Sequence, residues 1–159
     1  MNKAQIEGQW GFARLVYGNA RRQIERIPDD QLGFRPTADI RTIGELAVHM
    51  HQYLTELTEA VLTGQHVAAD EPKFATKAAL LNWADAQVAK GFENLGKITE
   101  AQLSQVIDAW GTKFPGWQLL SFVPTEVVHH RGQLMTYLRL LGVEPVFAYD
   151  FEPTAETGK

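Results

Sequence analysis

Apolar residues recur at steps of three and four along most of the chain, and this spacing predicts amphipathic helices. The predicted helices cover residues 3–27, about 43–62, roughly 75–97 and roughly 117–141. Pro28, Gly64 and Gly142 are stop signals directly after three of these segments. Four such helices joined by connections of varied length predict an all-α fold, a four-helix bundle. We expect a single domain over residues 1–146 and a tail over residues 147–159.

Short signals between the helices refine this outline. Thr42 followed by Glu45 reads as a capping box that opens the second helix, and Thr99 with Gln102 reads as another that opens a short helical turn. Residues 105–117 are aromatic and broken by Gly and Pro, so they form either a small hairpin or an irregular loop. Pro124 lies inside the pattern of the last helix, which is therefore kinked there or begins again near it.

Composition limits the classes of function. The chain has 159 residues, enough for a substantial core, and 45% of them are hydrophobic. The net charge is −4 and no tract is basic, which argues against nucleic acid as the main partner. There is no cysteine, so disulfides and thiolate metal ligands are excluded. The N-terminus lacks an apolar signal core and no apolar run is long enough to span a bilayer, so we expect a cytoplasmic protein without a membrane partner.

The strongest chemical signal lies in the last predicted helix. Glu126 and His130 are four residues apart and lie one above the other on one face. A carboxylate and an imidazole placed in this way can hold one metal ion. His49 lies on or next to the inward face of the second predicted helix. Since bundles build metal sites from inward side chains on facing helices, these three residues are the candidate ligands.

Each candidate also has a simpler interpretation. His130 could be a buried histidine with satisfied hydrogen bonds, and Glu126 could be a solvated residue or an ion-pair partner of Arg131. Gln133 could form a hydrogen bond near the site, or with Arg131 could brace helix packing.

The remaining histidines and two tyrosines are weaker candidates. His51 is about 200° around the helix from His49, so we expect it to face solvent. His129 points about 100° away from His130, which favours packing at a helix interface over a supporting role at the site. His66 has no evident partner. Tyr53 and Tyr137 each lie close to a candidate ligand and could be pocket walls or proton donors, although core packing is the favoured role.

Two strings carry a resemblance to a known family. HHRGQL followed by MTYLRLLGVEP, and RTIGELAVHM in the second helix, resemble the signature helices of the DinB/YfiT-like superfamily. The resemblance implies a four-helix bundle, often a homodimer, with a divalent metal ion held by three side chains. It places the first ligand at His49 and the last at His130. The middle position, often histidine in the family, is Glu126 here, and a His-Glu-His set suits Zn, Ni or Fe(II).

Two functions follow from these observations. The first is a metal-dependent enzyme, because a metal ion lowers the pKa of a bound water or thiol. The resemblance implies that its reaction is a thiol-dependent S-transfer, an isomerisation or a hydrolysis. Without cysteine in the chain, a thiol must come from a low-molecular-weight cosubstrate, and the substrate is a small molecule. The alternative is a non-catalytic, dimeric metal-binding bundle with a structural or stress-related role. A DNA-damage role, which the family name suggests, finds no support in the charge pattern.

Overall fold

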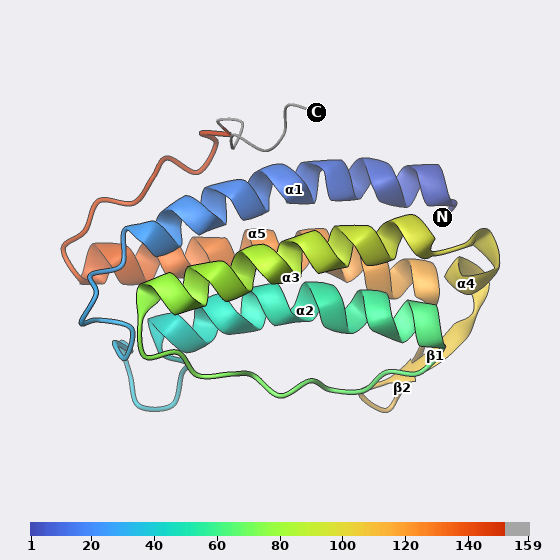
Figure 1. Ribbon diagram of the computed structural model, residues 1–159, viewed down its shortest axis with the longest axis horizontal. Helices are drawn as coiled ribbons and strands as arrows, with labels where there is room; N and C mark the ends of the chain where they lie inside the picture. The colour runs from blue at the N-terminus through green and yellow to red at the C-terminus, as the bar shows by residue number, and fades with distance from the viewer. Residues whose placement is uncertain (152–159) are drawn as a thin grey trace.

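Four long helices lie side by side in the computed structural model, which describes residues 1–151 (Figure 1). The elements are α1 (Lys3–Glu25), α2 (Ile43–Thr63), α3 (Lys77–Lys97), α4 (Glu100–Ser104), β1 (Val106–Ala109), β2 (Thr112–Pro115) and α5 (Gly116–Leu140). Helices α1, α2, α3 and α5 form the bundle, and α4 is a single short turn. The predicted all-α fold is confirmed. No helix in the described part of the chain is long and apolar enough to cross a membrane.

The direction of the helices explains the longest connection. Helices α1 and α5 run one way along the bundle, and α2 and α3 run the other way (Figure 1). Because α2 and α3 are parallel, the linker over residues 64–76 has to travel back along the whole bundle before α3 begins. Gly64 starts this return in the left-handed region, with φ 75°, where a residue without Cβ is unstrained.

Side-chain caps fix where the helices begin. Thr42 Oγ1 accepts from the Glu45 amide at 3.1 Å, and the Thr42 amide donates to Glu45 Oε2 at 2.8 Å. Thr99 and Gln102 make the same reciprocal pair at the start of α4. Both predicted capping boxes are confirmed, and they satisfy amide donors that a helix start leaves unpaired.

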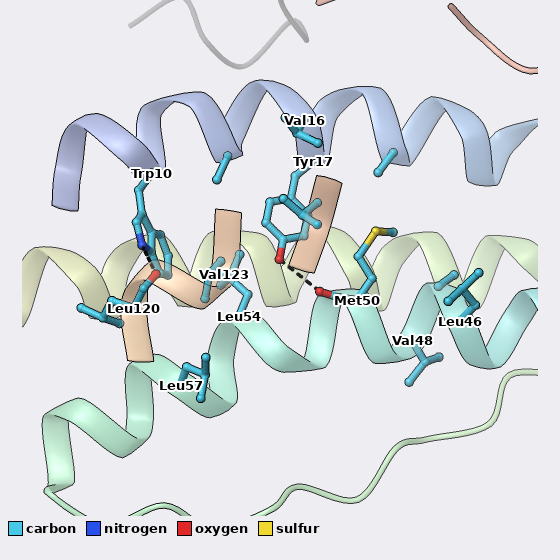
Figure 2. Packing of buried hydrophobic residues seen from close by; sticks show 14 of the residues in the cluster. Trp10, Val16, Tyr17, Leu46, Val48, Met50, Leu54, Leu57, Leu120 and Val123 are labelled. Carbon is cyan, nitrogen blue, oxygen red and sulfur yellow. Dashed lines mark hydrogen bonds between the residues drawn. The ribbon is translucent and has the colours of Figure 1, made fainter. Parts of the chain in front are cut away.

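Helix α5 passes through Pro124 without starting again. Proline has no amide hydrogen, so the carbonyl of Leu120, four residues earlier, loses its usual partner inside the helix. The indole Nε1 of Trp10, which is fully buried, donates to that carbonyl at 3.0 Å (Figure 2). A core side chain of α1 thus satisfies the acceptor that Pro124 frees in α5.

The hairpin interpretation of residues 105–117 is also confirmed. Strands β1 and β2 are antiparallel, with Ala109 opposite Thr112. The two residues between them, Trp110 and Gly111, both have positive φ, 53° and 76°. Ile107 and Ala109 are buried and fix the hairpin to the end of the bundle.

The chain leaves α5 through Gly142 and runs back along α1 (Figure 1). The Asn19 side-chain amide donates to the carbonyls of Phe147 at 2.9 Å and Asp150 at 3.0 Å. Gln23 bonds both the amide and the carbonyl of Val146. The first residues of the expected tail are therefore held by α1, while residues 152–159 lie outside the described part of the chain.

Candidate metal centre

His49 from α2 and Glu126 and His130 from α5 meet between the two helices. These two helices are antiparallel (Figure 1). One ligand atom from each of the three residues lies within 4.8 Å of the other two. The ring centroids of His49 and His130 are 4.9 Å apart, with the rings almost perpendicular at 84°. The structure therefore brings together all three residues that the sequence proposed as ligands.

The pair on α5 has the contact that its spacing predicted. His130 Nε2 lies 2.9 Å from Glu126 Oε2. The side chains of His130 and Glu126 are 9% and 30% exposed, and that of His49 is 21% exposed. The cluster is thus closed behind His130 and reaches solvent beside Glu126 and His49.

Two further side chains orient the imidazoles. His130 Nδ1 lies 2.8 Å from the amide oxygen of Gln133, and His49 Nδ1 lies 2.5 Å from Glu71 Oε1. Both oxygens can accept a hydrogen from Nδ1. With that hydrogen on Nδ1, the Nε2 atoms of both rings would be the ligands, and an ion would take the place of the hydrogen that His130 Nε2 shares with Glu126.

Burial sets the charge state of the central imidazole. The pKa of His130 is lowered, first by burial and also by the neighbouring His49, although Gln133 and Glu126 act in the opposite direction. A lower pKa favours the neutral imidazole, which is the form that binds a metal ion. The pKa of Tyr53 is raised by burial and by the charges of Glu126 and Glu56, so its phenol keeps its proton at neutral pH.

These residues fit a divalent transition metal ion. The donors are two imidazole nitrogens and a carboxylate oxygen, a set that suits Zn and its neighbours. Atoms bound to one such ion lie about 3–3.5 Å apart, since each bond is about 2.1 Å long. The 2.9 Å between His130 and Glu126 is close to that separation.

Comparison with known proteins places the chain in a family. The model of the DinB family matches residues 16–158, which is most of the chain. The chain belongs to the DinB family. A protein of Bacillus subtilis (strain 168), the uncharacterized protein YjoA, is 26% identical over 132 residues, covering 80% of this DinB-family chain and 86% of YjoA.

Solved structures show the same fold at lower identity. The DinB-like protein of Bacillus cereus ATCC 10987 is 18% identical, with a TM-score of 0.75 over 90% of this chain and 97% of that one. The structure of YjoA gives a TM-score of 0.68 at 23% identity, over 85% of this chain and 96% of YjoA. A mycothiol-dependent maleylpyruvate isomerase gives 0.66 at 20% identity, over 84% of this chain and 63% of the isomerase.

One prediction about this DinB-family chain is wrong: His51 does not face solvent. It is 1% exposed, its Nδ1 lies 2.7 Å from the Ala47 carbonyl, and its ring packs 5.3 Å from that of Tyr17 on α1. Burial lowers the pKa of His51 to about 4, so the ring is neutral at pH 7. The prediction assumed that α2 buries one face, whereas several elements cover this helix.

The other weak candidates also have definite positions. His129 is exposed, so it does not pack between helices of the described chain. His66 Nε2 lies 2.6 Å from Glu56 Oε1, a partner that the sequence did not reveal. The Tyr137 hydroxyl donates to the Arg41 carbonyl at 3.2 Å and is mostly buried, which fits its favoured role in packing.

Glu71 is the residue at the site that the sequence did not identify. It comes from the linker, where no periodic pattern reports which side chains point inward. Its Oε1 also lies 3.5 Å from Arg41 Nη2, so it is held from two sides. An acidic residue in a long linker was the only available signal, and it is a common feature of exposed loops.

Proposed function

We propose that this DinB-family chain binds one divalent metal ion, Zn, Ni or Fe(II), through His49, Glu126 and His130. The convergence of three ligand atoms within 4.8 Å, from two different helices, supports this site most directly. The contacts of Glu71 and Gln133 add support, because each leaves an imidazole Nε2 available as a ligand. The side chains of His49 and Glu126 are 21% and 30% exposed, so the site is open to solvent on that side.

We further propose that the site is catalytic and acts in a thiol-dependent S-transfer or isomerisation, or in a hydrolysis. When bound, the ion supplies a Lewis acid that lowers the pKa of a bound water or thiol. His49 and His130 hold it, and Glu126 adds a negative charge that moderates its acidity. The structural similarity to a mycothiol-dependent isomerase supports a thiol cosubstrate. The chain has no cysteine, so such a thiol must be a separate small molecule.

The first test is metal titration of protein purified without an affinity tag. His49→Ala and His130→Ala each remove a ligand, so each should weaken binding severely. Glu59→Ala is the control, because Glu59 is an exposed residue of α2 that pairs with Lys90 and lies outside the cluster. If both ligand variants bind one equivalent as tightly as the wild type does, the metal site lies elsewhere.

The role of Glu126 is tested by two replacements. Glu126→His keeps a metal-binding group on the same face of α5, so it should preserve binding. Glu126→Gln removes the charge and leaves a poor ligand, so it should bind more weakly than Glu126→His. Wild-type affinity in Glu126→Gln would show that two histidines alone hold the ion.

The non-catalytic alternative predicts a different metal environment. A structural ion has a complete protein shell, whereas a catalytic ion keeps a position for water or substrate. Three protein ligands leave such a position in a four-coordinate site. Water relaxation measured on Co²⁺- or Ni²⁺-loaded protein distinguishes the two, and an ion without exchangeable water would support the structural role.

We also propose that the protein forms a homodimer, on the basis of the family resemblance. Exposed aromatic side chains give some support, since Phe12, Phe147 and Tyr149 are 47%, 70% and 70% exposed. Sedimentation at high micromolar concentration tests this, and a monomer would contradict it.

A further inference from the structure

Four aromatic rings form a continuous row between α2 and α5 on the hairpin side of the proposed metal centre. Tyr53 of α2 stacks on Trp110 at the hairpin tip, with centroids 5.9 Å apart and ring planes at 7°. Trp110 contacts Phe114 of β2 at 6.3 Å, and Phe114 contacts Phe122 of α5 at 5.4 Å. The row therefore joins the two helices that carry the ligands.

The ends of the row lie one helical turn from the ligands. Tyr53 is four residues after His49 on α2, and their ring centroids are 6.0 Å apart. Phe122 is four residues before Glu126 on α5, on the same side of that helix. The row thus begins and ends one helical turn from the proposed ligands, and we call it the aromatic wall: Tyr53, Trp110, Phe114 and Phe122.

The backbone of Trp110 is unusual for this residue. It has φ 53° in a two-residue hairpin turn with Gly111. A turn with two positive φ angles favours Asn-Gly, and a bulky residue in this region is a strained outlier. Strain of this kind often marks a functional position. Ile107 and Ala109 also fix the hairpin, through buried side chains.

A buried pair holds the same ring from another direction. The ring centroid of His66 is 4.6 Å from that of Trp110. His66 Nε2 lies 2.6 Å from Glu56 Oε1, and the Ala69 amide donates to Glu56 Oε2 at 3.2 Å. The side chains of His66 and Glu56 are only 7% and 10% exposed. Trp110 is nevertheless 51% exposed, so a rigidly held ring still presents surface to a ligand.

We propose that Trp110 is a specificity-determining residue, and that the aromatic wall selects thiol ligands of the metal ion that carry an aromatic group next to the sulfur. This inference rests on the proposed metal function. Aromatic rings attract one another beyond their buried area, through edge-to-face and offset contacts. The group attached to a metal-bound sulfur would lie on the side of Tyr53, whose ring is 6.0 Å from that of His49 and 5.9 Å from that of Trp110.

The experiment compares two thiols of similar size on Co²⁺-loaded protein. Phenylmethanethiol carries an aromatic ring, and cyclohexylmethanethiol carries a saturated one. Their affinities are read from the near-ultraviolet charge-transfer absorption of the cobalt–sulfur bond, after the Co²⁺ affinity has been measured. The ratio of the two affinities is then compared between the wild type and each variant. Because the acidity of each thiol is the same in every measurement, its effect cancels in this comparison.

Trp110→Asn is the decisive variant, because it removes the ring and introduces the Asn-Gly pair that the turn favours. It should fold and bind Co²⁺ like the wild type, and its preference for phenylmethanethiol should fall by about threefold to tenfold. Trp110→Phe should retain most of the preference. The control is Val106→Asn on β1 of the same hairpin, where the replaced side chain is 62% exposed and lies outside the aromatic wall, and it should leave the preference unchanged.

The outcomes separate the two proposals. An unchanged preference in Trp110→Asn, with Co²⁺ bound normally, overturns the role of Trp110 and leaves the metal function intact. If the wild type does not bind Co²⁺, the metal function fails at the first titration and the role of Trp110 fails with it. Loss of the helical circular dichroism signal in Trp110→Asn would show that the ring is needed for folding, and would also overturn the proposal.

Discussion

The contact between Trp10 and Leu120 predicts an energetic coupling between α1 and Pro124. In the wild type, the buried carbonyl of Leu120 accepts from Trp10 Nε1 at 3.0 Å because Pro124 has no hydrogen to offer (Figure 2). Trp10→Phe removes this donor and leaves the carbonyl without a partner. In a Pro124→Ala background, the new amide at residue 124 can donate to the same carbonyl. The cost of Trp10→Phe should therefore depend on residue 124.

The magnitude follows from the two parts of that cost. An unpaired buried carbonyl costs about 1–3 kcal/mol. The smaller ring leaves a void at a position that is fully buried, which costs about 1–2 kcal/mol more. Only the first part disappears in the Pro124→Ala background. The coupling free energy between Trp10→Phe and Pro124→Ala should thus be about 1–3 kcal/mol, with the double variant more stable than the sum of the single effects.

Urea unfolding of the metal-free protein, followed by far-ultraviolet circular dichroism, measures the four free energies of this cycle. Trp83→Phe is the control, because within the described residues the Trp83 indole makes no side-chain hydrogen bond, and its ring packs 5.5 Å from Phe74. Its effect should be the same with Pro or Ala at residue 124. A coupling below about 0.5 kcal/mol for Trp10→Phe would show that the carbonyl is satisfied in another way, and would refute the reasoning.

Three further predictions concern the site and the start of α2. Glu71→Gln should weaken metal binding by about tenfold or more, because it removes the carboxylate that orients His49. Glu59 is an exposed glutamate that pairs with Lys90, so Glu59→Gln should have no effect in the same titration. Glu126→His should lower the apparent pKa of any metal-dependent activity measured across a pH series, since a neutral ligand leaves the ion a stronger Lewis acid; an unchanged pKa would exclude Glu126 from the shell. The hydrogen bond from the Thr42 amide lowers the pKa of Glu45 below its ordinary 4.5. The contribution of Glu45 to stability is therefore present above pH 4.5 and is lost as the pH falls through the lowered pKa. The urea midpoints of wild type and Glu45→Gln should converge in acid, and a difference that stays constant with pH would contradict this.

The periodic parts of the chain were predictable because burial imposes a repeat on them. The buried faces of α1 and α5 and the capping boxes at Thr42 and Thr99 appear in the structure as the sequence predicted. On α3 the prediction holds in part, because Leu81, Val88 and Phe92 are only partly buried. The contact between Glu126 and His130 follows from helical spacing alone. The meeting of His49 with that pair could not be read from one helix, since it depends on how α2 packs against α5.

Prediction failed where more than one neighbour covers a helix. The apolar residues of α2 predicted a single inward face for this helix, and His51 lay outside that face. In the fold, Tyr17 of α1 packs against His51, and its hydroxyl donates to the Met50 carbonyl at 3.1 Å (Figure 2). A pattern with one apolar face is typical of a helix at the edge of a bundle. For a helix that contacts several others, it underestimates the number of buried residues.

The topology itself accounts for the residues that surround the proposed ligands. Parallel α2 and α3 require a connection that returns along the bundle, and the observed linker does so beside α2. As it runs back, His66 meets Glu56, and then Glu71 meets His49, seven residues earlier on the helix. The linker therefore supplies both the carboxylate behind a ligand and the imidazole against Trp110. The linker that the helix directions require is therefore also the outer layer of the site. Because a linker has no helical period, the periodicity of the sequence could not reveal these contacts.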